Sequence, residues 1–398
     1  MGESPHRAGG EQRLLGGYTG RLLALVAACS LTTIGGQAVM APLLPAIIED
    51  LGITSSQVGA ALTAMAALSA VCRYPGGRLA DHLSRKTVLA VAIGAMTSGF
   101  AVLAVTPGYP VFLVGVVIVG VGAGLYLPSA FALLSDLFVG RRGQAIGINN
   151  AAVNLGGILA SGLAVVVLAR ASWRAAFVPV VAVFVVLLVL MHFWNDEPYV
   201  LVRVSFHPIS TARRLLADSR IRWMVISAAL VMFVQRGSVA FIPLYLHAEK
   251  ELSTALAGGF YAGFYLVGMI STPLTGWLGD QIGHTRVVLA ATVTAIAGLA
   301  VLLVGTTLAA IALGVVVFAL GLMGFWPAMN AYVLALFPDG SMGGDFGALG
   351  VLYLGVGSLG PAYVGFAAEQ TTFLVTFTGL VPCLLVSTGL NAWLAIRS

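Results

Sequence analysis

The chain has 398 residues, of which 59% are hydrophobic and only 9% are charged. A soluble domain usually carries about 25% charged residues, so this composition excludes an ordinary soluble protein and predicts a chain surrounded mainly by lipid. The formal net charge is +5, but the basic residues lie in short turns, which is typical of membrane topology and argues against nucleic acid as a partner. The cysteines Cys29, Cys72 and Cys383 lie in apolar runs without metal-ligand spacing, so we expect no metal site and no disulfide framework.

Twelve apolar runs follow one another along the chain, and each is long enough to cross a membrane as a helix, which takes about 20 residues. They span residues 20–48, 55–79, 87–106, 110–137, 144–169, 174–195, 222–246, 255–279, 287–305, 309–336, 345–369 and 371–396. The sequence therefore predicts an all-α membrane protein with twelve transmembrane helices.

An internal repeat divides these helices into two groups. Two polar turns between apolar runs share a glycine, an aspartate and a final cation, and they are 199 residues apart from Gly77 to Gly276 and from Asp81 to Asp280. A fixed offset of half the chain length indicates two copies of one unit. We therefore expect two pseudo-symmetric halves of six helices each.

The connections between the runs predict the domain organisation. We expect a cytoplasmic N-terminal tail at 1–19, an N-terminal six-helix half at 20–195, a cytoplasmic linker at 196–221 and a C-terminal six-helix half at 222–398. Within the linker, residues Ser210–Asp218 are compatible with a short helix lying on the inner membrane surface. A plain connector is favoured over a regulatory segment.

Arginine and lysine predict the orientation, because both are enriched in cytoplasmic loops. If both termini are cytoplasmic, only Arg170, Arg174 and Lys250 fall on the outer side, and the other loop arginines and lysines fall on the inner side. We therefore expect a multi-pass protein of the cytoplasmic membrane with both termini in the cytoplasm.

The first polar turn reads Gly77-Arg-Leu-Ala-Asp81-His-Leu-Ser-Arg85-Lys86. This stretch resembles the turn between the second and third membrane helices of the major facilitator superfamily. The resemblance implies the fold of that superfamily, secondary transport, and a role of the turn as a latch between the halves on the cytoplasmic side. The expected gating residues are Gly77, Asp81, Arg85, Asp136, Gly276, Asp280 and Arg286, with Asp136 as the partner of Arg85. A tight turn whose charges only set the topology is the alternative.

Two features that would indicate proton-coupled drug antiport are missing. Members of the superfamily often carry an arginine in the fourth helix that is linked to proton coupling, and here that position is Val116. The Gly-Pro pair of the fifth helix of drug/proton antiporters is also absent, although a Gly-x-x-Gly-Pro pattern occurs at Gly357–Pro361. The resemblance therefore supports the antiporter subclass only in part.

Two arginines fall inside the predicted helices. Arg236 lies about midway along the seventh run, where a charged side chain costs about 2.5–3.5 kcal/mol on insertion scales, and no aspartate or glutamate is expected at the centre of any run. An anionic substrate is the favoured partner, and a packed arginine satisfied by carbonyls and water is the alternative.

Arg73 lies nearer the cytoplasmic end of its run. Nitrate porters of the superfamily have an arginine there, but their second arginine has no counterpart in this chain, so a structural role is favoured.

Polar and aromatic side chains at mid-helix depth predict an amphipathic cavity between the halves, where transporter sites usually lie. Each of them alone is more often a packing residue than a ligand contact. The candidate substrate-binding residues are Arg236, Gln235, Gln37, Tyr126, Asn150, Asn154, Tyr261, Tyr265, Trp326, Asn330 and Tyr353.

The chain shows no nucleotide-binding loop and no hydrolase, kinase or redox constellation, so we expect no enzyme activity and no cofactor. The favoured function is secondary active transport of a small solute, preferably an anionic or neutral organic compound, by rocker-switch alternating access. A proton or a counter-anion could couple the transport, and a monomer is sufficient. One alternative is proton-coupled efflux of lipophilic compounds, with Asp136, Asp345 or Glu49 as proton carrier. A second alternative is a membrane sensor or scaffold that does not transport.

Overall fold

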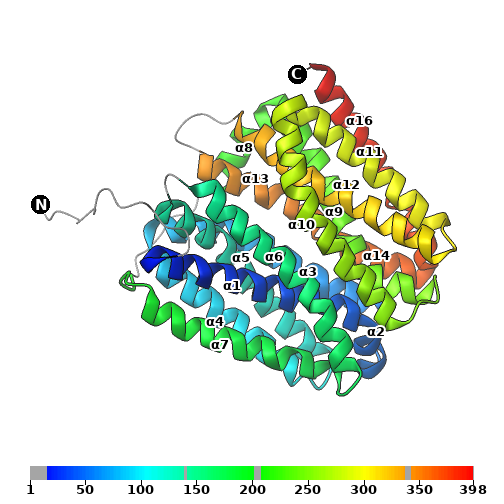
Figure 1. Cartoon of the computed structure of the whole chain (residues 1–398), viewed down its shortest axis with the longest axis horizontal. Coiled ribbons are helices and arrows are strands. Elements are labelled where there is room, and N and C mark those ends of the chain that lie inside the picture. The colour runs from blue at the N-terminus through cyan, green and yellow to red at the C-terminus, as the bar shows by residue number, and fades with distance from the viewer. Residues whose placement is uncertain (1–15, 139–140, 201–207, 337–341, 398) are drawn as a thin grey trace, which may run out of the picture.

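The computed structural model describes residues 16–138, 141–200, 208–336 and 342–397. These parts of the chain are helical and contain no strand (Figure 1). They include twelve spans that are long and apolar enough to cross a membrane, which confirms the twelve predicted runs. Most of the predicted N-terminal tail lies outside the described residues, and the first helix begins at Gly17.

The helices form two groups of six spans. The first group consists of α1 (Gly17–Ala38) with α2 (Met40–Leu51), α3 (Ser55–His82), α4 (Arg85–Ala104), α5 (Tyr109–Leu137), α6 (Arg142–Leu168), the short η1 (Trp173–Ala176) and α7 (Phe177–Trp194). The second group consists of α9 (Ser219–Ala248), α10 (Thr254–Ile282), α11 (His284–Val304), α12 (Leu308–Leu334), α13 (Met342–Gly357) with α14 (Gly360–Gln370), and α15 (Phe373–Thr378) with α16 (Val381–Arg397). Figure 1 shows the first group at the lower left and most of the second at the upper right.

Hydroxyl residues begin several of these helices. The side chains of Thr54, Ser84, Ser253 and Thr307 each accept a hydrogen bond from the backbone N–H three residues later, at 3.1–3.3 Å. Such N-caps satisfy one of the free N–H groups at a helix start and contribute about 1 kcal/mol each. The polar residues between the apolar runs therefore also determine where the helices start.

Three spans are broken into two helices, although the sequence predicts continuous runs there. In each of them the first helix ends four residues before a proline. The helix ends are Ala38, Gly357 and Thr378, and the prolines are Pro42, Pro361 and Pro382. A proline lacks the N–H that would bond the carbonyl four residues earlier, and its ring clashes with that carbonyl. Pro75 and Pro327 lie inside helices that continue, so packing decides whether a break follows.

The repeat is visible in the packing of each half. A Cβ atom placed on Gly77 would lie 3.7 Å from Cβ of Pro128, and a Cβ atom on Gly276 would lie 3.7 Å from Cβ of Pro327. Both residues of the first contact are 199 positions before their counterparts in the second. The same contact therefore joins α3 to α5 and α10 to α12, as expected for two copies of one unit.

The two groups pack against each other through α3 with α13 and α14, α6 with α10, and α2 with α9. Where α3 begins and α14 ends, a Cβ atom on Gly59 would lie only 3.1 Å from Cα of Gly365, so the two backbones are in contact. Close by, the N–H of Ala362 donates a 2.9 Å hydrogen bond to Oγ1 of Thr63. The break before α14 leaves this N–H without a helical partner, and the other half supplies one.

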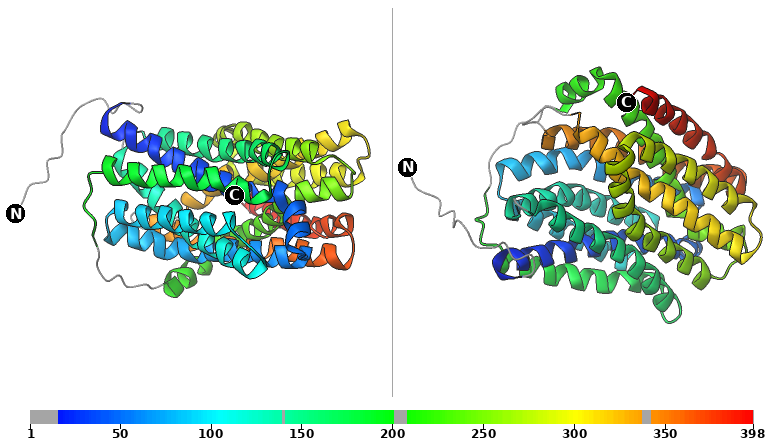
Figure 2. Two further views of the ribbon diagram at one scale, coloured as in Figure 1. Left: turned by 90° about the horizontal axis from the view of Figure 1, so that it is seen from below. Right: turned by 45° about the horizontal axis from the view of Figure 1, so that its top comes forward.

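The connection between the halves contains α8 (Pro208–Ala217), close to the short helix expected in the linker. It packs on α9 and α13, and Figures 1 and 2 show it beside the end of the bundle at which α13 begins.

Candidate functional site

A cavity of about 370 Å³ lies between the two groups of helices. Its walls come from α1, α2, α3 and α6 of the first group and from α9, α10, α12, α13 and α14 of the second. Small-molecule sites in proteins usually occupy about 300–1,000 Å³, so the cavity can hold a small organic compound. Nine of the eleven residues proposed from the sequence line it: Gln37, Asn154, Gln235, Arg236, Tyr261, Tyr265, Trp326, Asn330 and Tyr353.

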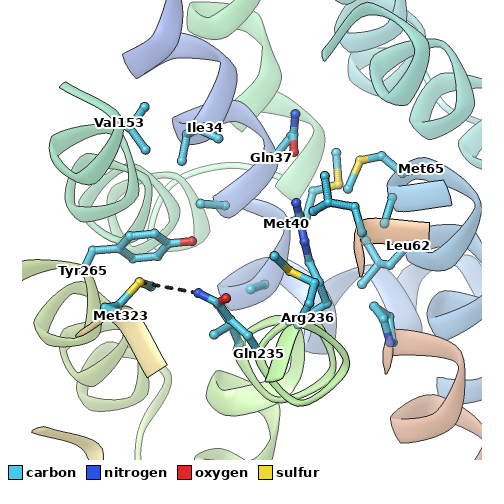
Figure 3. A pocket seen from close by; sticks show the side chains of 18 of the residues that line it. Ile34, Gln37, Met40, Leu62, Met65, Val153, Gln235, Arg236, Tyr265 and Met323 are labelled. Atoms are coloured by element: carbon cyan, nitrogen blue, oxygen red, sulfur yellow. Dashed lines mark hydrogen bonds between the residues drawn. The ribbon is translucent and has the colours of Figure 1, made fainter. Parts of the chain in front are cut away.

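Arg236 lies near the middle of α9, and its half-buried side chain lines the cavity. Figure 3 shows it extending from α9 toward the side of the cavity where Gln37 lies. Within the described parts of the chain, the Arg236 guanidinium makes no hydrogen bond and no ion pair. A guanidinium has five N–H donors, so this group is available to a bound molecule.

Arg73 on α3 lines the same cavity, which differs from the structural role favoured by the sequence. Its Nε atom is buried and has no hydrogen-bond partner among the described residues. The two guanidinium groups are near enough for their like charges to repel each other, and Tyr353 lies near both. The position of Arg73 in the sequence does not show that its side chain lines the cavity, because the shape of the cavity depends on how the two halves pack together.

No aspartate or glutamate is found among the cavity-lining residues in the described parts of the chain. The positive charges of Arg73 and Arg236 therefore have no carboxylate beside them in the cavity. Charge–charge interactions are stronger in a low-dielectric interior than in water. The arrangement favours the binding of a negatively charged group.

Hydrogen bonds and ring contacts hold the polar wall of the cavity in place. Nε1 of Trp326 donates to Oε1 of Gln235 at 2.7 Å. Nε2 of Gln235 contacts Sδ of Met323 at 3.4 Å, as Figure 3 shows. The hydroxyl groups of Tyr261 and Tyr265, one turn apart on α10, are 3.4 Å from each other. These contacts orient the Gln235 amide and both phenols before any molecule binds.

The rest of the lining is apolar and adaptable. Met40, Met65, Met232 and Met323 all reach the cavity, together with small and branched aliphatic side chains. Methionine is flexible and polarisable, so it adapts to ligands of different shape. The cavity is therefore amphipathic, as the sequence predicted, but the methionines were not among the candidates because a methionine in an apolar run carries no polar signal.

Tyr126 and Asn150 do not line the cavity. Tyr126 is fully buried inside the first half, where its hydroxyl donates to the carbonyl of Val26 at 2.7 Å and lies 3.0 Å from Oγ of Ser30. Asn150 lies one turn from Asn154 on α6, and its backbone carbonyl accepts a 3.1 Å hydrogen bond from the Asn154 side chain. Mid-helix depth alone therefore did not distinguish cavity-facing residues from residues that pack within one half.

The gating candidates lie at the ends of helices, away from the cavity. Nε of Arg85 donates to Oδ2 of Asp136 at 3.2 Å, so the expected pair is present and joins α4 to α5 within one half. In the second half, Nε2 of His284 lies 3.7 Å from Oδ1 of Asp280, and Arg286 donates to the carbonyl of Ile282. The side chain of Asp81 lies outside the described residues, and Gly77 and Gly276 make the proline contacts given above.

A sequence profile described as Major Facilitator Superfamily matches residues 26–361. The chain belongs to the Major Facilitator Superfamily. Two solved members of the superfamily fold share its architecture. A bacterial homolog of the human lysosomal transporter Spinster, inward-facing and occupied, has a TM-score of 0.76 at 18% identity and covers 94% of this chain and 96% of its own. The human organic anion transporter MFSD10 has a TM-score of 0.71 at 17% identity, and the match covers 93% of this chain and 99% of the MFSD10 chain.

Curated superfamily relatives include transporters and resistance proteins. The quinolone resistance protein NorA of Staphylococcus aureus (strain MSSA476) is 26% identical over 238 residues, which cover 56% of this chain and 59% of NorA. The match to NorA thus spans less than two thirds of that protein. The probable 4-methylmuconolactone transporter of Cupriavidus pinatubonensis (strain JMP 134 / LMG 1197) is 27% identical over 354 residues, or 83% of this chain and 81% of its own. These findings confirm the predicted superfamily fold and a multi-pass membrane protein of a transporter family.

Proposed function

We propose that this superfamily member is a secondary active transporter that moves a small organic anion through the cavity between its two halves. The observation that carries the proposal is the cavity itself, which two arginines line without a carboxylate beside them. Unpaired charges inside membrane-spanning helices are costly, so Arg73 and Arg236 are better satisfied when an anion is bound. The aromatic and methionine lining suits the apolar body of an organic compound.

Alternating access is the proposed mechanism, because the cavity walls come from both halves. The contact of Gly59 with Gly365 lies at one end of the bundle, and it would have to open for the cavity to be exposed there. The distribution of arginine and lysine favours that end as the outer side. We propose that the Arg85–Asp136 pair and its counterpart region around Asp280 take part in gating at the opposite end.

A second candidate function is proton-coupled efflux of lipophilic compounds. The methionine-rich and aromatic lining supports it, as does the partial match to the quinolone resistance protein NorA. A proton carrier would then be an acid outside the cavity, because the described lining residues include none. Organic anion transport remains the preferred proposal for this reason.

Thermal stabilisation of the purified protein would test the proposal. We would compare benzoate, benzamide and benzylammonium, which share one ring and differ in charge, on wild type, Arg236→Gln and Arg170→Gln. Arg170 is an exposed arginine outside the cavity and serves as the matched control. A ligand at 100 times its Kd stabilises the folded state by about 2.7 kcal/mol. We expect the carboxylate to stabilise wild type and Arg170→Gln but not Arg236→Gln, and radiolabelled carboxylate to cross liposomes that contain the protein.

Stabilisation by the ammonium compound alone, unchanged in Arg236→Gln, would contradict anion transport and support drug efflux. Binding of the carboxylate without any flux, in either direction and under any ion gradient, would instead support the sensor or scaffold alternative.

A further inference from the structure

Arg73 and Arg236 come from different halves of the protein but line the same cavity. Arg73 belongs to α3 of the first group and Arg236 to α9 of the second. Neither guanidinium forms an ion pair within the described parts of the chain, and the two repel each other. The cavity therefore holds two positive charges, one from each half.

A single carboxylate would not balance this charge. A monoanion bound to Arg236 would leave Arg73 unpaired, with its buried Nε still lacking a hydrogen-bond acceptor. A charge that is removed from water and left without a partner of opposite charge lowers stability strongly. An anion with two acidic groups would satisfy both arginines and remove their mutual repulsion.

We propose that Arg73 and Arg236 form a two-point site for an organic dicarboxylate, with one carboxylate on each guanidinium and the apolar body of the molecule between them. This inference rests on the proposed function. The planar guanidinium matches a carboxylate with two parallel hydrogen bonds, which adds geometric selectivity. Tyr353 lines the same cavity near both arginines, so its hydroxyl can donate to the bound molecule, and the lining methionines can contact the hydrocarbon part of that molecule.

The two-point site has a consequence for the transport cycle. A dicarboxylate that contacts α3 and α9 together bridges the halves, whereas the empty cavity leaves two like charges opposed. Binding therefore favours the arrangement in which both halves surround the cavity. A dicarboxylate should accordingly stabilise the protein more than a monocarboxylate of the same length.

The test compares straight-chain dicarboxylates from succinate to suberate with their monomethyl esters, which keep the length and remove one charge. Binding would be measured by calorimetry on purified wild type, Arg73→Gln, Arg73→Lys, Arg236→Gln and the control Arg170→Gln. We expect at least one dicarboxylate to bind wild type and Arg170→Gln about tenfold or more tightly than its half-ester, since one hydrogen-bonded charge contact is worth that much. In Arg73→Gln the affinity ratio of dicarboxylate to half-ester should fall toward one. Arg73→Lys keeps the charge and should keep part of this preference.

Size-exclusion profiles and melting temperatures would establish that each variant is folded. The two-point site would be refuted if every half-ester bound wild type as tightly as its dicarboxylate, or if Arg73→Gln left the ratio unchanged. If the two-point site were refuted in this way but half-esters bound wild type and not Arg236→Gln, the proposed anion transport would still stand. If no member of either series bound wild type while benzoate did, the two-point site alone would fail; if benzoate did not bind either, both proposals would fail.

Discussion

The indole Nε1 of Trp326 donates a 2.7 Å hydrogen bond to Oε1 of Gln235, and this bond connects α12 to α9 in the cavity wall. Gln235 directly precedes Arg236, so the bond helps to hold the part of α9 that presents the guanidinium. The ring of Trp326 also packs on Tyr353, with the ring centroids 5.4 Å apart. Trp326 is therefore placed to respond to a bound molecule.

We expect Trp326→Phe to weaken anion binding by up to about tenfold, because a neutral hydrogen bond contributes about 0.5–1.5 kcal/mol. The same change should abolish most of the ligand-dependent change in tryptophan fluorescence. Trp277→Phe is the control, since Trp277 is 58% exposed on the outside of α10. A ligand-dependent signal that persists in Trp326→Phe and disappears in Trp277→Phe would place the binding site elsewhere.

Tyr126→Phe should lower stability without changing which anions bind. The substitution removes a buried hydroxyl that bonds the carbonyl of Val26 and Oγ of Ser30. Leaving such groups unsatisfied costs about 1–3 kcal/mol. The control Tyr199→Phe removes a hydroxyl from a half-exposed ring; this hydroxyl lies 3.0 Å from Nδ1 of His192, but water can replace the contact, so the loss of stability should be smaller than for Tyr126→Phe. Melting temperature and anion affinity would be measured together; an affinity loss as large as that of Arg236→Gln would assign Tyr126 to binding instead.

Loss of the Arg85–Asp136 pair should affect transport more than stability. The pair is partly exposed, with 18% and 58% of the side-chain surfaces accessible, and exposed pairs contribute about 1 kcal/mol or less. If it gates the cavity, Asp136→Asn should reduce flux in liposomes and leave anion affinity unchanged. The exchange of both charges, Arg85→Asp with Asp136→Arg, should restore part of the flux.

Arg21→Gln is the control for this pair, because Arg21 is an exposed arginine in the first turns of α1. Unaltered flux in Asp136→Asn would show that the pair only stabilises the turn, as the alternative interpretation of the sequence holds.

Gly59→Ala should loosen the contact between α3 and α14. Its new Cβ atom would lie 2.5 Å from the carbonyl oxygen of Pro361 and 3.1 Å from Cα of Gly365, so one helix must move. In a background without the native cysteines, a cysteine introduced at the cavity-lining position Ala66 should then react faster with a water-soluble thiol reagent. Gly94→Ala is the control, because a Cβ atom there meets nothing within 4 Å. Equal labelling rates in the two variants would argue against opening at this contact.

Part of the site was predictable because depth in the membrane is a local property of the sequence. Arg236, Gln235 and Trp326 were recognised as polar or aromatic residues in the middle of apolar runs, and all three line the cavity. Tyr126 fulfils the same criterion but packs inside one half, because depth does not say which face of a helix points to the interface. For Arg73 the sequence favoured a structural role, because the second arginine of the nitrate porters has no counterpart in this chain; that Arg73 lines the cavity became visible only in the tertiary structure.

The fold followed from the sequence to a greater extent than the site did. Spans are determined by length and hydropathy, and the 199-residue repeat indicated two similar halves, because corresponding small residues and prolines make the same contacts, as Gly77 with Pro128 and Gly276 with Pro327 show. The tertiary structure alone decided which side chains share the cavity and that two arginines without an ion-pair partner among the described residues, one from each half, line it together. The physical reason is that these contacts depend on the relative placement of two halves, and no local pattern in either half encodes that placement.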